Sequence, residues 1–433
     1  MTDEVQAREP DSIGVGSAGA LIAGNMIGAG VFTTSGFALA DLGSRAAVLL
    51  AWFVGGLIAL CGAWSYVRLA RALPGNGGEY LFLSRAVHPL AGFLAGWVSL
   101  LAGFTAPIAV AAHGLEAYTL ESFGLAWPPG VLGATAILGA GLAHGITRES
   151  GLRIQNVAVA AQIVAIVGFI LLGAFAIPSI ASPSVPATPL ATPVSISAFA
   201  VTLIWISFSY SGWNAAVYVA GEMREPSRTL MRATLLGTVG VVVLYVLLNA
   251  VFVYSAPIDL LAGRAEVGAI AAEALGGGTV RRVLSAIVAL GLATSISAMV
   301  MVGPRIYAQM ADDGVLPSAL GSGSAPPRAA IGLQVGLALV AFFLSDLREL
   351  LLYVGFLLGL SAAGTVACLF MLDPDRDAEE GTSRLHPWLP LVFIGATLGS
   401  AAFLVVSEPA QAFAGFGTLA IGALVYWLAS RSR

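Results

Sequence analysis

Two apolar segments of this chain are each interrupted in the middle by glycine and polar residues. The first covers residues 24–32 (GNMIGAGVF) and the second covers residues 208–214 (FSYSGWN). A membrane helix interrupted in this way frees backbone N–H and C=O groups that lipid cannot satisfy. Such groups are tolerated only where they line a cavity or bind something. The two interruptions therefore constrain both the fold of the chain and its function.

The composition is that of an integral membrane protein. Hydrophobic residues make up 58% of the chain and charged residues only 10%, against about 25% charged in soluble proteins. The 52 glycines are consistent with helices that pack closely in lipid. Residues 1–12 are polar and lack the basic start and cleavage site of a secretory signal, so we expect the first span to remain in the protein.

Apolar stretches of about 20 residues, long enough to cross the hydrocarbon core, predict an all-α membrane protein with twelve transmembrane helices. The predicted spans are residues 13–40, 45–70, 89–118, 128–147, 153–177, 196–222, 231–256, 281–310, 329–345, 349–372, 388–406 and 411–430. The chain has no Lys, and all 20 basic residues are Arg. With a cytoplasmic N-terminus, only five of them fall outside: Arg45, Arg264, Arg281, Arg282 and Arg348. This bias predicts a multi-pass protein of the cell (inner) membrane with both termini in the cytoplasm.

The two interrupted spans are the first and the sixth, and each opens a group of five. Residues 13–177 form the first group and residues 196–372 the second. Because five is odd, the second group enters the membrane from the opposite side. This pattern predicts a 5+5 inverted repeat with a site between the broken helices. The other predicted regions are a cytoplasmic tail (1–12), an external loop (178–195), an acidic cytoplasmic loop (373–387), and helices 11 and 12 with a short tail (388–433).

One further loop, residues 257–280, contains an amphipathic stretch from Glu266 to Leu275 that is followed by three glycines. We interpret this stretch as an external helix that lies over the pore.

The first interruption offers backbone groups of both polarities. Residues 28–30 (GAG) carry no bulky side chain, so a ligand can approach the backbone closely. Amides that start the second half-helix suit a carboxylate, and carbonyls near Asn25 and Met26 suit an ammonium group. A zwitterionic α-amino acid matches both ends. A packing notch remains the alternative, since Gly24 and Gly28 also form a Gly-x-x-x-Gly motif.

The second interruption combines small polar residues with aromatic ones. Its members are Phe208, Ser209, Tyr210, Ser211, Gly212, Trp213 and Asn214. Aromatic rings at this position would close over a bound solute and exclude water. For any single ring, ordinary bilayer or core packing is the alternative interpretation.

Six motifs give the chain a resemblance to a known family. They are residues 24–32 (GNMIGAGVF), 73–80 (LPGNGGEY), 92–97 (GFLAGW), 210–214 (YSGWN), 221–226 (GEMREP) and 305–317 (RIYAQMADDGVLP). With these motifs in this order, the chain resembles the amino acid–polyamine–organocation superfamily, and specifically its amino acid permease branch. The resemblance covers most of residues 13–320, whereas the last four spans are similar only in hydropathy.

The resemblance implies a role for individual residues. The amides of Ala29 and Gly30 would bind the substrate carboxylate, and the carbonyls of Met26, Phe208 and Ser211 would bind its amine. Phe208 matches the position of an aromatic gate, Gly28 matches the motif glycine, and Trp213 and Asn214 would face the substrate side chain. The full predicted substrate-binding set is Met26, Ile27, Gly28, Ala29, Gly30, Phe208, Ser211, Gly212, Trp213 and Asn214.

Coupling is where the chain departs from the family. Gln162 occupies the position of a Lys that many proton-coupled members carry, and Gln does not titrate. Either another group couples transport or the protein is an exchanger or uniporter. Ser295 and Ser297 are candidates for a sodium-like site. His113 and Glu116, one turn apart near the outer end of the third span, form either a local pair or an outer proton or substrate contact.

These observations predict a secondary transporter that moves neutral L-amino acids by alternating access, as an exchanger or an ion-coupled symporter. No acid is placed near the midplane to neutralise a cationic side chain. Transport of cationic amino acids or polyamines, and amino acid export, are the alternatives.

An enzyme is not expected, because the four His residues are scattered over loops and different spans: His88, His113, His144 and His386. No cofactor, metal or nucleic acid is expected either. The expected partners are the amino acid substrate and the lipid bilayer. Cys61 and Cys368 lie inside spans, so we expect no disulfide-linked partner, and the protein would be a monomer or a homodimer.

Overall fold

The computed structural model describes residues 14–74, 78–146, 152–180, 194–218, 226–312, 314, 316–321, 323, 326–372 and 387–431. All regular secondary structure in these ranges is helical. The predicted N-terminal tail, most of the external loop, the acidic loop up to residue 386 and the motif residues 75–77 and 221–225 lie outside the described ranges.

The helices run in chain order as follows: α1 (Val15–Met26), α2 (Ala29–Leu42), α3 (Arg45–Ala72), α4 (Gly78–Ala86), α5 (Pro89–Val98), the π-helix η1 (Ser99–Thr105), α6 (Ala106–Phe123), α7 (Val131–Ile146), α8 (Leu152–Ile180), α9 (Ile196–Ser209), α10 (Ala215–Tyr218), α11 (Pro226–Tyr254), α12 (Ile258–Leu261), α13 (Val267–Asp312), the short 3-10 helix η3 (Ser318–Leu320), α14 (Arg328–Leu344), α15 (Leu347–Ala367), the 3-10 helix η4 (Cys368–Phe370), α16 (Trp388–Ser407) and α17 (Pro409–Arg431).

Among the described residues, eight helices are long and apolar enough to cross a membrane, or nine if the bent pair α1 and α2 counts as one span. Helices α7, α9 and α14 are apolar but shorter. A helix or a pair of helices lies in each of the twelve predicted ranges. The multi-pass membrane architecture is therefore confirmed, while the count of twelve spans and the inverted repeat remain predictions.

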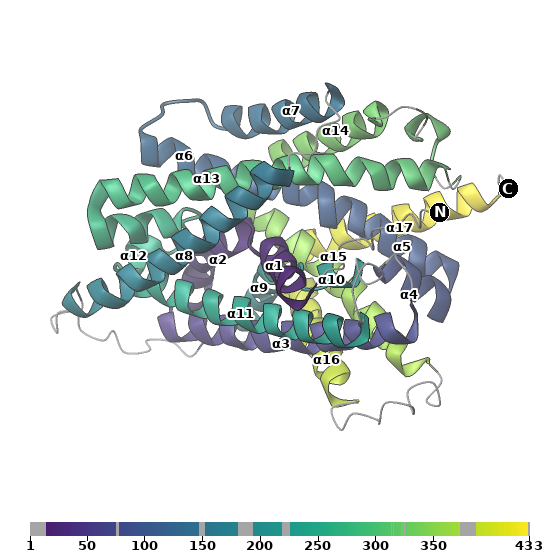
Figure 1. The fold of residues 1–433 in the computed structure, drawn as a ribbon, viewed down its shortest axis with the longest axis horizontal. Helices are drawn as coiled ribbons and strands as arrows, with labels where there is room; N and C mark the ends of the chain where they lie inside the picture. Colours follow the sequence, from purple (N-terminus) through teal and green to yellow (C-terminus); the bar gives the residue numbers. More distant parts are fainter. Residues whose placement is uncertain are drawn as a thin grey trace, which may run out of the picture.

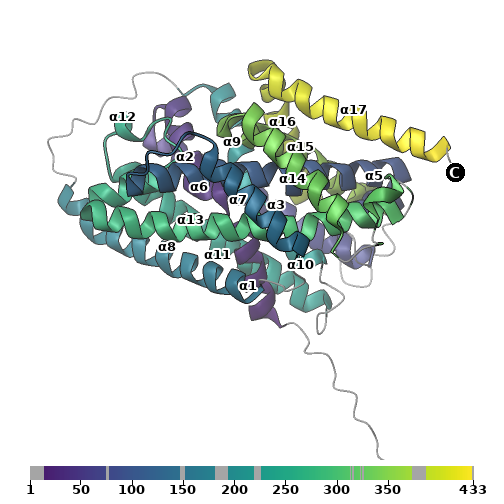
Figure 2. The same cartoon turned by 90° about the horizontal axis from the view of Figure 1, so that it is seen from above.

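The long helices lie side by side and run across the view in Figure 1. Helices α4 and α5 and the end of α17 lie at one end of the bundle, and α12 lies at the other. Helix α1 is the exception, because it leaves the bundle steeply in Figure 2, bent by 44° from α2.

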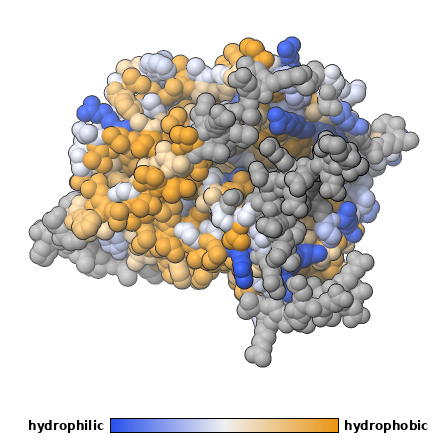
Figure 3. Space-filling model, viewed as in Figure 1, coloured by the Kyte–Doolittle hydropathy of each residue, from blue (hydrophilic) through white to orange (hydrophobic). Residues whose placement is uncertain are grey.

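Apolar side chains cover much of the face shown in Figure 3. Large exposed apolar residues on α8 and α11 include Val164, Leu171, Phe175, Leu236, Val243 and Leu247. A soluble monomer rarely exposes so large a continuous apolar surface. The outer faces of these helices are therefore suited to contact with lipid.

Two breaks in the long helical segments, one between α5 and α6 and one within α13, have local causes. The chain between α5 and α6 passes through the π-helical turn η1, and Pro107 follows directly in the first turn of α6. Proline has no N–H to donate to the carbonyl four residues earlier, so the regular helical ladder is broken there. In α13 the break lies at Gly276 and Gly277, and Gly277 has a φ of +71°, which glycine adopts without strain. The stretch predicted as an external helix is helical and forms the part of α13 before this break, while its external location remains a prediction.

Glu116 and His113 bond to other partners rather than to each other. The Glu116 carboxylate accepts hydrogen bonds from the backbone N–H groups of Gly130 (3.1 Å), Leu132 (3.0 Å) and Gly133 (3.3 Å). It therefore takes up N–H groups at the start of α7 that the helix itself cannot satisfy. His113 Nε2 lies 3.1 Å from the Ser345 carbonyl oxygen.

We predict that Glu116→Leu lowers the stability of the protein by about 1–3 kcal/mol, because three backbone donors lose their acceptor. The melting temperature in detergent would fall clearly below that of the wild type. Asp259→Asn, at an exposed position on α12, is the control and should melt as the wild type does. Equal melting of Glu116→Leu and the wild type would show that the carboxylate does not hold α7 in place.

Candidate functional site

The two predicted interruptions exist, and their backbones touch. Helix α1 ends at Met26 and α2 starts at Ala29, while α9 ends at Ser209 and a turn of residues 210–214 precedes α10. Gly212 in this turn has a φ of +110°. A Cβ on Gly212 would lie 2.7 Å from the Asn25 carbonyl oxygen. Both the backbone conformation and the contact therefore require glycine.

A second contact joins the two broken spans close to their interruptions, between α2 and α9. The hydroxyl groups of Thr34 on α2 and Ser209 on α9 are 3.1 Å apart. A Cβ on Gly30 would lie 2.9 Å from Ser209 Cα, so Gly30 lets α2 and α9 approach closely. Gly28 is different, because no atom lies within 4 Å of the place its Cβ would take. The first interruption is thus tightly packed at Gly30 and open at Gly28.

The first interruption leaves backbone groups of both polarities at the junction. No side chain caps the start of α2 at Gly28, so the first amides of α2 have no partner within the helix. At the end of α1, the Ile27 N–H donates to the Ala23 carbonyl (3.0 Å), and the Met26 carbonyl accepts from the Tyr245 hydroxyl (2.6 Å). A carbonyl oxygen has two lone pairs, so the Met26 carbonyl can accept one more hydrogen bond.

The second interruption has a buried and a less buried side. Tyr210 is fully buried, and its hydroxyl donates to the Trp52 carbonyl (3.0 Å). Phe208 is half-buried, and its carbonyl accepts from the Ser211 N–H (2.9 Å). Ser211 is half-buried as well. Gly212 and Asn214 are half-buried too, so the less buried side of the second interruption consists of Phe208, Ser211, Gly212 and Asn214.

Trp213 and Asn214 have partners within the protein. The Trp213 ring packs edge-on against Tyr66 (4.7 Å between centroids) and Phe393 (6.2 Å). The Asn214 amide donates to Glu79 Oε1 (3.2 Å). That these two side chains face the substrate remains a prediction.

Glu79 was not among the residues predicted from the sequence. It lies in the first turn of α4, is only 8% exposed, and also accepts from the hydroxyls of Tyr66 (2.8 Å) and, more weakly, Ser99 (3.5 Å). Burial raises the pKa of this carboxyl above its usual range. The available signal was its motif, residues 73–80, in which an acid follows two glycines and opens a helix.

The predicted coupling residues fall into separate groups. Gln162 is buried on α8 and packs directly against Gly291 of α13. The Ser295 hydroxyl donates to the Gly291 carbonyl (2.9 Å), so Gln162 and Ser295 share this contact point. Ser297 lies 2.8 Å from His144 Nε2 instead. Ser295 and Ser297 therefore do not share a hydrogen-bond partner.

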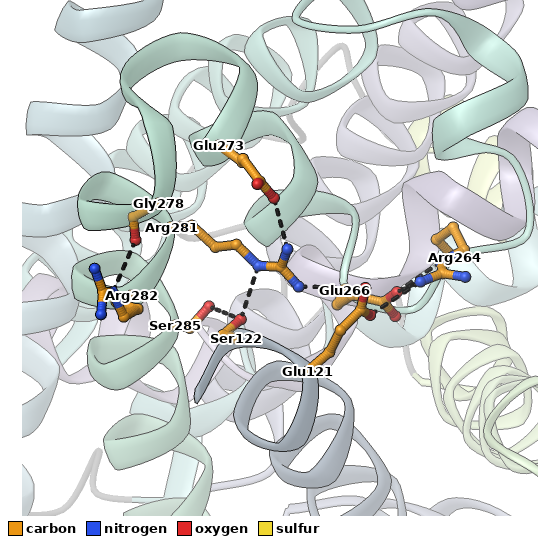
Figure 4. Close-up of polar contacts among 9 residues, drawn as sticks. All are labelled: Glu121, Ser122, Arg264, Glu266, Glu273, Gly278, Arg281, Arg282 and Ser285. Carbon is orange, nitrogen blue, oxygen red and sulfur yellow. Dashed lines mark hydrogen bonds and ion pairs between the residues drawn. The ribbon is translucent and has the colours of Figure 1, made fainter. Parts of the chain in front are cut away.

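Charged residues gather at the end of the bundle where α12 lies, as Figure 4 shows. Glu121 at the end of α6 forms ion pairs with Arg264 (2.9 Å) and Arg281 (3.3 Å). Arg264 also pairs with Glu266 (2.6 Å), and Arg281 with Glu273 (2.6 Å). This network ties the segment between α12 and α13 to α6.

The same segment rests directly on α2. The Gly263 N–H donates to the Gly36 carbonyl (2.7 Å), and the Arg264 carbonyl lies against the place where a Cβ of Gly36 would be. The second half of the first broken span is thus covered at the α12 end.

On another side, the first interruption borders a groove of about 340 Å³ between α1, α8 and α11. Its lining includes Gly19, Ala23 and Ile27 of the first broken span and Ile163, Gly237 and Leu244 of the neighbouring helices. The groove is lined almost entirely by small and apolar residues. Ile27 of the predicted site is therefore reached from this side.

Comparisons with known proteins agree on one family. A family model described as "Amino acid permease" matches residues 13–429. The mouse large neutral amino acids transporter small subunit 2 is 28% identical, over 96% of this chain and 80% of its own length. The mouse Asc-type amino acid transporter 1 is 27% identical over the same shares. The serine/threonine exchanger SteT of Bacillus subtilis (strain 168) is 25% identical over 87% of both chains.

We predict that Gly212→Ala destabilises the junction of the two interruptions, because alanine is strained at a φ of +110° and its methyl group meets the Asn25 carbonyl. The loss would be about 1–3 kcal/mol, visible as a lower melting temperature in detergent. Gly139→Ala is the matched control, since nothing lies within 4 Å of its Cβ position on α7. A wild-type melting temperature for Gly212→Ala would mean that the two backbones do not need this contact.

Proposed function

Because the chain belongs to the amino acid permease family, we propose that it carries neutral α-amino acids across the membrane by alternating access, as an exchanger or an ion-coupled symporter. The observation that carries this proposal is the contact between the two interrupted helices at Gly212 and Asn25. It brings the ends of four half-helices to one place. The three relatives compared above bear names that concern amino acid transport, and two of these names specify large neutral amino acids or serine and threonine.

The carboxylate of the substrate binds the uncapped amides of Ala29 and Gly30 in this proposal. A helix start attracts an anion through its free N–H groups and its dipole. Gly28 supports the assignment, because the open space at its Cβ position leaves room for a ligand beside these amides.

The substrate amine binds the carbonyls of Met26, Phe208 and Ser211. The Met26 carbonyl accepts one hydrogen bond, from Tyr245, which leaves it a second lone pair. The Phe208 carbonyl accepts from the N–H groups of Ser211 and Tyr210, so the amine would share this oxygen with them. Phe208 closes over the bound solute as the aromatic gate, and its half-buried position is compatible with that role.

A neutral substrate side chain fits the charges around the junction. Glu79 is the acid whose contacts reach the second interruption, and its oxygens are occupied by Tyr66, Asn214 and Ser99. A cationic side chain would have to displace these donors. We therefore favour neutral amino acids over cationic amino acids and polyamines.

The wider architecture is part of the proposal. Twelve spans in a 5+5 inverted repeat, the domain limits given above, the cell membrane location and cytoplasmic termini are all proposed. The α12 end would then face outside, and the ion pairs of Figure 4 would close the outer route in this conformation. Cys61 and Cys368 are buried, which argues against a disulfide-linked partner, and a monomer or homodimer is part of the proposal.

Reconstituted into liposomes, the protein should take up a radiolabelled neutral amino acid saturably, and faster when the same amino acid is inside. Unlabelled neutral amino acids should compete, whereas arginine and polyamines should not. Uptake of no amino acid under any gradient would refute transport, and flux that is neither saturable nor stimulated from inside would indicate a channel. Insensitivity to sodium and to an uncoupler would identify an exchanger or uniporter.

Gly28→Val should weaken substrate binding without unfolding the protein. Valine tolerates the extended backbone of Gly28 (φ −136°, ψ −161°), and its side chain would fill the space proposed for the carboxylate. We expect KM to rise about tenfold or more, which corresponds to about 1.4 kcal/mol, with an unchanged melting temperature. Gly139→Val serves as the control in another open position. A wild-type KM for Gly28→Val would show that the substrate carboxylate does not bind beside Gly28.

A further inference from the structure

The carboxyl group of Glu79 connects α4 with three other parts of the bundle. Its partners are Tyr66 on α3, Ser99 in the π-helix η1 and Asn214 in the second interruption. Tyr66 also packs against Trp213, the residue before Asn214. Two neighbouring residues of the interruption are therefore held, directly or through one ring, by this acid.

All three partners of Glu79 are uncharged. Among the described residues, no ion pair reaches the carboxyl group, although the side chain is only 8% exposed. An ionised carboxylate without a counter-ion is costly in such surroundings. Burial accordingly raises the pKa of Glu79.

The hydrogen bonds are distributed unequally over the two oxygens. Oε1 accepts from both Tyr66 (2.8 Å) and Asn214 (3.2 Å), whereas Oε2 has a single long contact of 3.5 Å with Ser99 Oγ. A neutral carboxyl group is compatible with this pattern, with Oε1 as the carbonyl oxygen that accepts both short hydrogen bonds and the proton on Oε2, which accepts only the long contact from Ser99.

The other titratable groups on the elements that pack against α4 have contacts of their own. On α3, Arg68 lies over the Trp64 ring, and Arg71 lies one turn further along. On α4 itself, Arg85 donates to the Pro74 carbonyl. His88 Nδ1 at the start of α5 accepts from the Leu90 N–H, and the Cys368 thiol of η4 contacts the Gly364 carbonyl. On α15, which also packs against α4, the Tyr353 hydroxyl bonds with Thr418, Arg348 pairs with Asp41 and Glu408, and Glu349 accepts from the Asp346 N–H. Tyr66 is the titratable group that bonds Glu79.

We propose that Glu79 carries a proton in this conformation and that its protonation positions the second interruption of the substrate site. When Glu79 loses the proton, the charge requires water, so α4 moves away from Asn214 and the interruption is released. Glu79 is thus a positioning residue that makes transport depend on pH, in a chain whose position 162 carries the non-titrating Gln. This inference rests on the proposed transport of neutral amino acids.

The main test is exchange of a neutral amino acid in proteoliposomes, with equal pH on both sides and an uncoupler present, between about pH 5.5 and 8.5. The wild-type rate should change by about tenfold for one pH unit beyond the midpoint, as a single titrating group requires. Glu79→Gln keeps the size and the accepting oxygen but does not titrate. Its rate should be independent of pH, with KM within about twofold of the wild type at pH 5.5.

Asp259→Asn, which removes an exposed acid on α12, should retain the wild-type pH profile. Tyr66→Phe should move the midpoint to higher pH, because the Tyr66 hydroxyl stabilises the ionised form of Glu79. A Glu79→Gln profile equal to that of the wild type would overturn the proposal, as would a flat wild-type profile or an unmoved midpoint in Tyr66→Phe.

A second measurement does not depend on transport. Because the pKa of Glu79 is raised in the folded protein, the folded state binds more protons than the unfolded state above the unfolded pKa of about 4.3. The melting temperature of the wild type should therefore fall relative to Glu79→Gln as the pH rises through the folded pKa. A difference in melting temperature between the wild type and Glu79→Gln that does not change with pH would show that Glu79 does not carry the proposed proton. If no amino acid is exchanged but this difference appears, the proposed substrate is wrong and the role of Glu79 as proton carrier stands.

Discussion

The structure depends on how the backbone groups freed by the two interruptions are satisfied. Each interruption removes hydrogen bonds that a continuous helix would make, and lipid offers no partner for the freed groups. Specific hydrogen bonds satisfy part of these groups: the Tyr245 hydroxyl donates to the Met26 carbonyl, and the Ser211 N–H donates to the Phe208 carbonyl. The Gly212 backbone then lies against Asn25. No side chain caps the start of α2, and its first amides are the groups that we propose for the substrate carboxylate.

Hydropathy together with clustered glycines was enough to predict the long apolar helices and both interruptions, because long apolar runs and clustered glycines are local features of the chain. The sequence did not separate the two glycines of the first interruption. Gly30 packs against Ser209, whereas no atom lies within 4 Å of the Cβ position of Gly28, so close packing occurs at Gly30 and not at Gly28, one of the two glycines of the predicted packing motif. That distinction depends on which residue of α9 lies opposite, and no local pattern contains it.

Glu79 illustrates the same limit. In the sequence it stands in a polar connection between two spans, where acids are normally solvated. In the structure α4 places it against Tyr66 and Asn214, which lie 13 and 135 positions away along the chain. Asn214 was predicted to face the substrate from its position in the motif. In the structure its amide donates to an acid from another element, a contact that spacing along the chain does not reveal. That Asn214 faces the substrate remains a prediction.

The π-helical turn η1 has a consequence for how the third span can move. Such a turn holds one residue more than an α-helical turn, so the faces of α5 and α6 are offset by about 100° relative to a continuous helix. The surplus residue can pass along the helix by exchanging one hydrogen bond at a time. A span of this kind rotates one half against the other without separating from its neighbours. Ser99 begins the turn and contacts Glu79, so that rotation would change the contact between Ser99 and Glu79 first.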